Sequence, residues 1–125
     1  MVDVVIVGGG LAGSLAAWHL HTTRQDLSVT LLEAGATLGG NHTWSFHATD
    51  LPAASRTWLA PLVARRWPRH QVAFPSFART LDHEYCAVTS ERLHAVVSAR
   101  LGSRVRLGAA VESLTPTSVH LAGGE

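Results

Sequence analysis

The stretch DVVIVGGGLAG, residues Asp3 to Gly13, decides the fold of this 125-residue chain. Residues 3–7 form a short apolar run rich in β-branched side chains, which is typical of a fully buried parallel strand. Three glycines break this run, and from Leu11 to about His21 the apolar side chains recur at helical spacing. Residues 28–32 (SVTLL) predict a second strand. The whole stretch therefore predicts a βαβ unit, for which we expect a right-handed crossover.

The glycines match the pattern G-x-G-x-x-G in the context that a dinucleotide-binding turn requires, between a strand and a helix. We expect Gly8 to make the tight turn and Gly10 to let the backbone approach a pyrophosphate. Gly13 is expected to allow close packing of the helix on the strand. The backbone amides near Leu11 and Ala12 would then hold the phosphate charge at the helix N-terminus.

Glu33 directly follows the second predicted strand, and this is the position at which a dinucleotide-binding unit carries an acidic residue. We expect Glu33 to accept hydrogen bonds from the adenosine ribose and, through its charge, to repel a 2′-phosphate. The alternative is a glycine turn in an unrelated α/β protein, with a glutamate at this position by chance.

The rest of the chain predicts shorter elements. We expect a long structured loop over residues 34–50 and a helix over residues 51–66, capped by Asp50 and kinked or divided at Pro61. A second helix would start after a cap at Thr89 or Ser90 and stop at Gly102. Short strands are expected over residues 70–74, 80–81 and 85–88, as a small antiparallel excursion from the α/β fold. Further short strands are expected over residues 105–107, 110–114 and 118–121, followed by a hairpin turn at Gly123, Gly124 and Glu125.

Composition excludes several classes of function. A net charge of +1 is not the excess of positive charge that is typical of nucleic-acid-binding proteins, so we expect no nucleic-acid partner. The eight histidines are scattered without the spacing of metal ligands, so no metal site is expected. Cys86, the single cysteine, fits a reducing compartment, and no apolar run is long enough to span a bilayer.

The residues after Glu33 favour FAD over NAD as the dinucleotide. Gly39, Gly40 and Asn41 form a second glycine-rich turn, which resembles the Rossmann-like α/β FAD-binding fold of the glutathione-reductase type, where the chain passes close to the cofactor. Arg92 resembles an arginine that related flavoproteins place near the cofactor, although an exposed helix arginine is the alternative. Val111 resembles the position whose backbone meets the adenine, with its side chain expected in the core.

The run GGNHTWSF, residues 39–46, is the most specific stretch of the chain. Together with APLV (60–63), WP (67–68), QVAFP (71–75) and TSER (89–92), it resembles the bacterial lycopene β-cyclases of carotenoid biosynthesis. The resemblance runs along residues 1–125, as the N-terminal and incomplete part of an FAD-binding domain. It implies a cytoplasmic, FAD-dependent enzyme in peripheral contact with the membrane, where Trp58 and Trp67 are candidate interfacial residues.

The resemblance also implies the reaction. Reduced FAD, with NAD(P)H as the reductant, would assist closure of the linear ends of lycopene into β-rings, giving γ- and β-carotene without net redox change. A proton adds to the terminal alkene, an internal double bond attacks the carbocation, and a proton leaves. Such a site needs a strong acid in a dry, apolar cavity, which Trp44 and Phe46 are candidates to line.

No catalytic residue is assigned from the sequence. His42 is a candidate proton carrier, but a loop histidine is more often structural or solvated. The acid that the resemblance implies is expected beyond residue 125. Two alternatives stay open: another FAD-dependent oxidoreductase or monooxygenase of this fold, and a catalytically inactive nucleotide-binding remnant.

Overall fold

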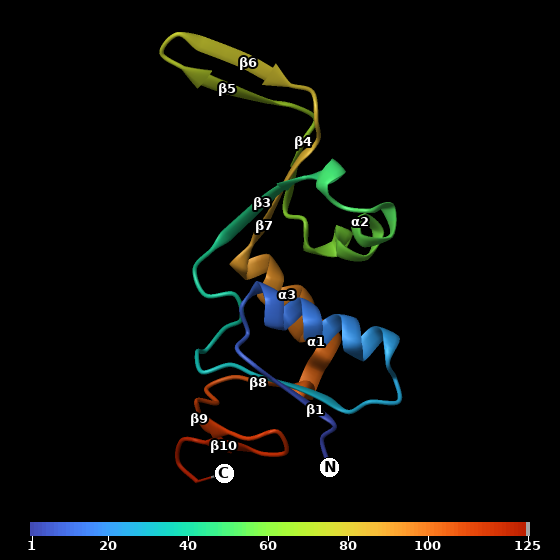
Figure 1. Cartoon of the computed structure of the whole chain (residues 1–125), viewed down its shortest axis with the longest axis vertical. Helices are drawn as coiled ribbons and strands as arrows, with labels where there is room; N and C mark the ends of the chain where they lie inside the picture. The colour runs from blue at the N-terminus through green and yellow to red at the C-terminus, as the bar shows by residue number, and fades with distance from the viewer. Residues whose placement is uncertain (125) are drawn as a thin grey trace. The chain divides into compact units, whose positions relative to one another are not determined.

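The computed structural model describes residues 1–124, which divide into two compact units (Figure 1). Unit 1 comprises Met1–Asn41 and the described residues from Leu93 onward, and unit 2 is His42–Arg92. The division means that the glycine turn and Glu33 belong to one unit, whereas Arg92 belongs to the other.

Unit 1 contains the predicted βαβ unit. Strand β1 (Val4–Val7) runs parallel to β2 (Val29–Leu32), and the 13-residue helix α1 (Leu11–Thr23) connects them. A third parallel strand, β8 (Val105–Arg106), pairs with β2, so the strand order is β1-β2-β8 and β2 is central. The prediction of a parallel sheet with α1 as its first crossover is therefore confirmed.

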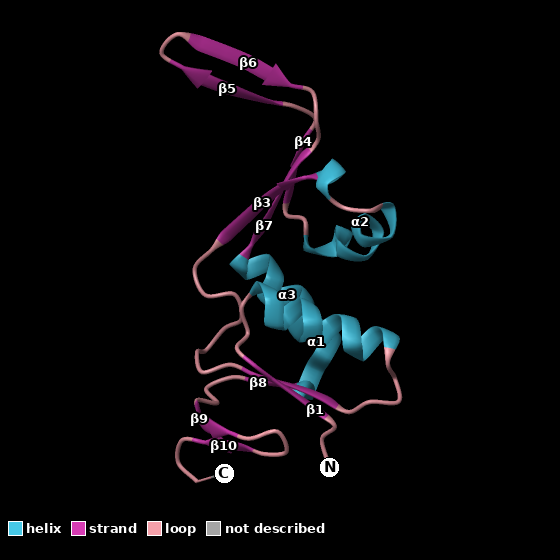
Figure 2. Cartoon of the chain, in the orientation of Figure 1, coloured by secondary structure: helices cyan, strands magenta, loops and turns pink. Residues whose placement is uncertain are grey.

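The central strand β2 of the sheet in unit 1 is covered on both faces, as expected for a parallel sheet. Val29 and Leu31 are 1% and 0% exposed and share one face of β2. Helices α1 and α3 (Ser90–Leu101) lie on one side of the sheet in Figure 2. The antiparallel pair β9 (Val111–Leu114) and β10 (Val119–Leu121) covers the other side, where Leu32 packs in one core cluster with Ala109 and Leu121.

The prediction of a fully buried first strand is wrong. Val5 and Val7, on one face of the edge strand β1, are 37% and 46% exposed, and the core cluster of Leu32, Ala109 and Leu121 includes neither of them. Ile6, on the opposite face, points toward α1, since its Cγ2 would lie 3.4 Å from a Cβ added at Gly13. A run of apolar residues shows that a strand favours burial on both faces, but it does not show which neighbours supply that burial.

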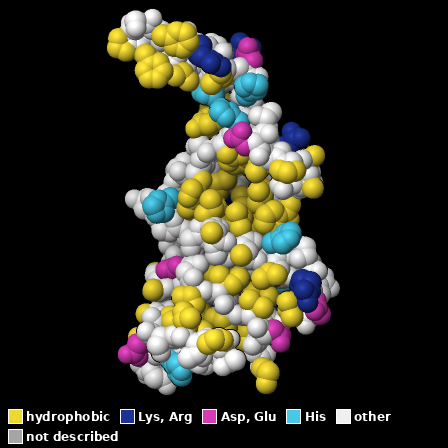
Figure 3. Space-filling model, in the orientation of Figure 1, with side chains coloured by type: hydrophobic (Ala, Val, Ile, Leu, Met, Phe, Trp, Pro, Cys, Tyr) yellow, Lys and Arg dark blue, Asp and Glu magenta, His cyan; other side chains and the backbone are white. Residues whose placement is uncertain are grey.

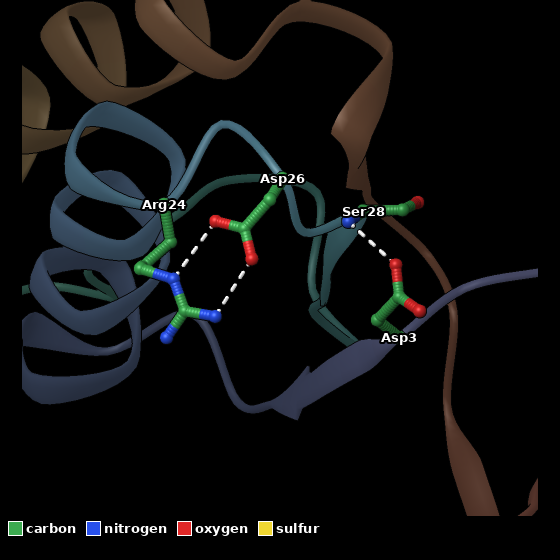
Figure 4. Close-up of polar contacts among 4 residues, drawn as sticks. All are labelled: Asp3, Arg24, Asp26 and Ser28. Atoms are coloured by element: carbon green, nitrogen blue, oxygen red, sulfur yellow. Dashed lines mark hydrogen bonds and ion pairs between the residues drawn. The ribbon is translucent and has the colours of Figure 1, made fainter.

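The polar turn between α1 and β2 is held by side chains (Figure 4). Arg24 donates from Nε and Nη2 to the two carboxylate oxygens of Asp26, at 2.8 and 2.7 Å. This pair is exposed, so its contribution to stability is small. Asp3 accepts a hydrogen bond from the backbone N–H of Ser28 at 2.8 Å, which fixes the start of β2 beside the start of β1.

Helix α3 matches its prediction at both ends. Thr89 Oγ1 accepts a hydrogen bond from the N–H of Arg92 at 3.2 Å, as an N-cap does. Leu93, Val97 and Leu101 are buried on one face, and Gly102 ends the helix with a φ of +56°. Near the C-terminus, Gly123 and Gly124 also have positive φ, in line with the predicted turn, whereas Glu125 lies outside the described residues.

Unit 2 holds two antiparallel sheets. Strands β3 (Thr43–His47), β7 (Tyr85–Thr89) and β4 (Arg65–Trp67) pair in the order β3-β7-β4. Strands β5 (His70–Phe74) and β6 (Phe77–Leu81) form a separate hairpin. Helix α2 (Ala53–Leu59) and short 3₁₀ turns at Ala48–Asp50 and Ala60–Leu62 complete this unit.

Two predictions for unit 2 are wrong. The expected loop 34–50 contains β3, whose alternation of exposed Thr43 and Ser45 with part-buried Trp44 and Phe46 was the missed signal. The expected helix 51–66 ends at Leu59, because the chain turns at Pro61 and then pairs with β7 as β4. Asp50 does not cap α2; its Oδ2 accepts from the N–H of His47 at 3.1 Å, within the first 3₁₀ turn.

No helix within residues 1–124 is both long enough and apolar enough to cross a membrane.

Candidate functional site

The glycine turn between β1 and α1 has the geometry that its motif predicts. Gly8 has a φ of +99°, a left-handed conformation that glycine adopts without strain, and its N–H donates to the carbonyl of Leu32 at 2.8 Å. A Cβ at Gly13 would overlap the carbonyl oxygen of Gly8. Only glycine at position 13 lets α1 approach the turn this closely.

The turn is open on the side where a ligand would approach. A Cβ added at Gly10 meets no atom within 4 Å. The first N–H groups of α1, which include those of Leu11 and Ala12, have no partner within the helix, and the first turn contains no acidic side chain. An accessible helix N-terminus with no acidic side chain in its own first turn fits the pyrophosphate of a dinucleotide.

Glu33 lies immediately after β2 and contacts the turn directly. Its Oε2 accepts a hydrogen bond from the N–H of Gly9, and its Oε1 accepts one from the N–H of Gly35, both at 2.7 Å. Each carboxylate oxygen can accept a second hydrogen bond, so Glu33 retains capacity for ribose hydroxyls. The sequence predicted only the ribose contact, and the structure adds that the carboxylate also orients the backbone on both sides of it.

The loop after Glu33 returns to the glycine turn. The N–H of Gly39 donates to the carbonyl of Gly9 at 2.8 Å, and the fully buried Leu38 packs so closely under Gly9 that a Cβ there would overlap it. Gly39 and Gly40 both have positive φ, and Gly40 and Asn41 are exposed at the end of the loop. Gly40 and Asn41 are therefore accessible in unit 1, and no contact of theirs assigns them a role.

Two residues of this network were missed from the sequence. Ser14 is fully buried in α1, and its hydroxyl donates to the carbonyl of Gly9 at 3.1 Å. His94 of α3 accepts a hydrogen bond at Nδ1 from the N–H of Leu38, at 3.1 Å. No motif links His94 to Leu38 because 56 positions separate them, whereas the place of Ser14 directly after the fingerprint was an available signal.

We expect replacement of His94 by leucine to lower the free energy of unfolding by about 1–2 kcal/mol, because the N–H of Leu38 loses its acceptor. Urea unfolding followed by circular dichroism measures the difference. His94→Asn is the matched control, since an amide oxygen can replace Nδ1 as the acceptor. Equal loss of stability in both variants would contradict a role for this hydrogen bond.

The remaining predicted site residues have other contacts. Val111 is part-buried at the start of β9 and packs against the cluster of Leu32, Ala109 and Leu121, as its side chain was expected to do. Arg92 is exposed, and its Nε donates to the carbonyl of Pro61 at 2.8 Å within unit 2. The described contacts thus give Arg92 a structural partner, and its role toward a cofactor stays a prediction.

The candidate residues for the reaction cavity all lie in unit 2. His42 is exposed, and its ring lies 5.7 Å from that of the part-buried Trp44. Phe46 lines a cavity of about 10 Å³, which has no room for a polyene. Within unit 2 these residues do not form a substrate cavity.

Among residues 1–124, no three histidine, cysteine or acidic side chains are placed to hold a metal ion. Cys86 is a buried free cysteine on β7, where its Sγ lies 3.7 Å from Nη1 of Arg66. Burial raises the pKa of the Cys86 thiol, an effect that the nearby Arg66 opposes.

We expect Cys86 to react slowly with iodoacetamide at neutral pH, because burial both shields the thiol and raises its pKa. The alkylation rate should rise as the pH increases through and beyond the ordinary thiol pKa. A Ser103→Cys variant provides an exposed thiol for comparison in the same chain. Equal rates at the two positions would contradict the buried environment of Cys86.

Together, the parallel βαβ unit, the open glycine turn and the anchored acidic residue after β2 define a dinucleotide-binding α/β domain of the Rossmann-like, FAD-binding type. Solved structures share this fold. A 2-methyl-3-hydroxypyridine-5-carboxylic acid oxygenase gives a TM-score of 0.72 at 18% identity, over 98% of this chain and 36% of that one. A putative FAD containing monooxygenase from Photorhabdus luminescens gives 0.61 at 14% identity, over 98% of this chain and 36% of that one.

The chain belongs to the lycopene cyclase family, since the family described as "Lycopene cyclase protein" matches residues 3–125. A lycopene beta-cyclase from Pseudescherichia vulneris is 46% identical over 125 residues, which make up 100% of this chain and 32% of that protein. The chain therefore spans about a third of the length of this curated relative. These comparisons confirm the family and the fold class that the sequence predicts.

Proposed function

We propose that this chain forms the adenosine-diphosphate half of an FAD site in a protein that closes the linear ends of lycopene into β-rings. The observation that carries the FAD site is the carboxylate of Glu33, held at 2.7 Å by the N–H groups of Gly9 and Gly35 beside an open glycine turn. Support for the reaction comes from membership in the lycopene cyclase family and from the name of the Pseudescherichia vulneris relative.

The residues of unit 1 would bind and orient the cofactor. The amides at the start of α1 would hold the pyrophosphate, and Glu33 would accept hydrogen bonds from the ribose hydroxyls. The hydroxyl of Ser14 and the N–H of Gly39 both donate to the carbonyl of Gly9, and these two hydrogen bonds would fix the conformation of the turn that binds the pyrophosphate. When bound and reduced, with NAD(P)H as the reductant, the flavin would supply electron density that stabilises a cationic transition state.

The acid that protonates the terminal alkene is proposed to lie outside the described residues. A carboxyl group able to protonate an alkene needs dry surroundings. The side chains of Asp50, Asp82 and Glu84 are 60%, 76% and 44% exposed, and Asp82 and Glu84 pair with arginines. These three carboxyl groups are exposed to water, so none of them lies in the dry surroundings that the step requires.

The test uses the full-length protein with lycopene, FAD and NADPH in detergent micelles or vesicles. We expect cyclised products of the same mass as lycopene, separated by chromatography. Products carrying an added oxygen would identify a monooxygenase instead. Absence of any product from a protein that retains its flavin absorbance band after gel filtration would identify the inactive nucleotide-binding remnant.

A further inference from the structure

One face of the β5–β6 hairpin of unit 2 carries two aromatic rings. Residues that pair directly across an antiparallel hairpin share a face, and the register pairs Phe74 with Phe77 and Val72 with Arg79. The pairs Ala73–Ala78 and Gln71–Thr80 lie on the opposite face. The hairpin therefore presents two phenylalanines beside its turn and Arg79 on the same face.

The two phenylalanines are uncovered in unit 2. Phe74 and Phe77 are 64% and 56% exposed, and Trp67 on the preceding strand β4 is 43% exposed. All other tryptophans and phenylalanines in the chain are buried or part-buried. Figure 3 shows yellow side chains gathered at the tip of this hairpin, with dark-blue arginine atoms next to them. Exposed aromatic rings concentrated in one short segment mark an interaction surface.

The same segment is basic. Residues 65–81 contain four arginines and no acidic residue. Arg66 pairs with Glu84 at 2.7 Å and Arg69 with Asp82 at 3.5 Å, whereas within the described part of the chain no ion pair involves Arg65 or Arg79. A surface with exposed aromatic rings and unpaired arginines is complementary to the headgroups and acyl chains of an anionic bilayer.

We propose that the β5–β6 hairpin docks on anionic phospholipid membranes. Phe74 and Phe77 insert at the headgroup level, where aromatic rings are favoured, while Arg65 and Arg79 contact lipid phosphates. Trp67 belongs to this surface as a sequence-predicted interfacial residue, whereas Trp58 is part-buried in α2 and does not. The proposal rests on the proposed function in one respect, because an apolar polyene substrate would be taken from the membrane.

The test measures flotation of the full-length protein with vesicles of phosphatidylcholine containing phosphatidylglycerol. We expect the double variant Phe74→Ser, Phe77→Ser to bind these vesicles about tenfold more weakly or worse. Arg65→Gln with Arg79→Gln should remove most of the preference for anionic over pure phosphatidylcholine vesicles. Leu114→Ser is the matched control, since Leu114 is as exposed as Phe74, at 63%, but lies on β9 in unit 1.

A labelling experiment separates the membrane from another part of the protein as the partner of the hairpin. In the full-length Phe77→Cys variant, a water-soluble maleimide should react readily with position 77, and added anionic vesicles should protect it. Protection without vesicles would show that the hairpin packs against the protein itself and would overturn the proposal. Equal vesicle binding by the wild type and the double phenylalanine variant would also overturn it.

The flavin content of every variant is measured by absorbance in parallel. Normal flavin with lost vesicle binding supports the hairpin proposal. Vesicle binding by a protein that holds no flavin would count against the proposed function and leave the hairpin proposal standing.

Discussion

Replacing Glu33 by arginine is expected to lower the affinity of the full-length protein for FAD by at least about 100-fold. The carboxylate accepts two backbone hydrogen bonds at 2.7 Å and is the proposed acceptor for the ribose. A guanidinium cannot accept any of these hydrogen bonds, so the N–H groups of Gly9 and Gly35 would lose their partner. The variant therefore loses the ribose contact and the local shape of the turn together.

Isothermal titration of the apoprotein with FAD measures this loss. Glu33→Gln should fall between the wild type and Glu33→Arg, because its amide keeps one accepting oxygen. Glu112→Arg makes the same change of charge at an exposed position of β9 in unit 1 and should bind FAD normally. Unchanged FAD affinity in Glu33→Arg would show that the ribose assignment is wrong.

Replacing Gly13 by valine is expected to destabilise the protein by about 2–4 kcal/mol and to abolish FAD binding. The added Cβ would overlap the carbonyl oxygen of Gly8, which is backbone and cannot rotate away as a side chain can. Relief of this overlap requires α1 to move off the sheet, which would also move the amides proposed to hold the pyrophosphate. Thermal unfolding and flavin absorbance measure the two effects.

Gly10→Ala is the informative comparison for Gly13. A Cβ at position 10 meets no protein atom within 4 Å, and Gly10 has a φ of −68°, which alanine adopts readily. We expect its apoprotein to unfold like the wild type while its FAD affinity falls at least about tenfold, because the methyl group occupies space proposed for the pyrophosphate. Wild-type affinity in Gly10→Ala would place the pyrophosphate elsewhere.

The part of the site that could be predicted from the sequence is the part whose geometry is local. Gly8, Gly10 and Gly13 lie within one turn and the helix that follows it, so their spacing in the sequence is enough to predict where they lie in the structure. The position of Glu33 could also be predicted, because the βαβ unit brings the end of β2 beside the glycine turn. Helix α3 was predicted for the same reason, since its cap, apolar face and terminal glycine are all read along one segment.

The remainder depends on contacts between distant segments. Strands β3 and β4 are short and contain histidine, serine or arginine, and they form because β7 pairs with both of them. Pairing with a distant strand overrides weak local preference. The three residues of β4 show no alternation, and the alternation of β3 covers only five residues. His94 is a similar case, since its contact with Leu38 exists only after α3 packs in unit 1.

The exposed edge of β1 has a consequence for how a longer protein of this family is made. Of the strands described here β1 is synthesised first, and β2 pairs with one side of it, but no strand among residues 1–124 pairs with the other. The backbone donors and acceptors on the unpaired side of this apolar strand then remain available to any extended segment of a neighbouring nascent chain. Overproduction of these residues alone is therefore expected to give aggregates, and chaperones that hold extended apolar segments should raise the soluble yield.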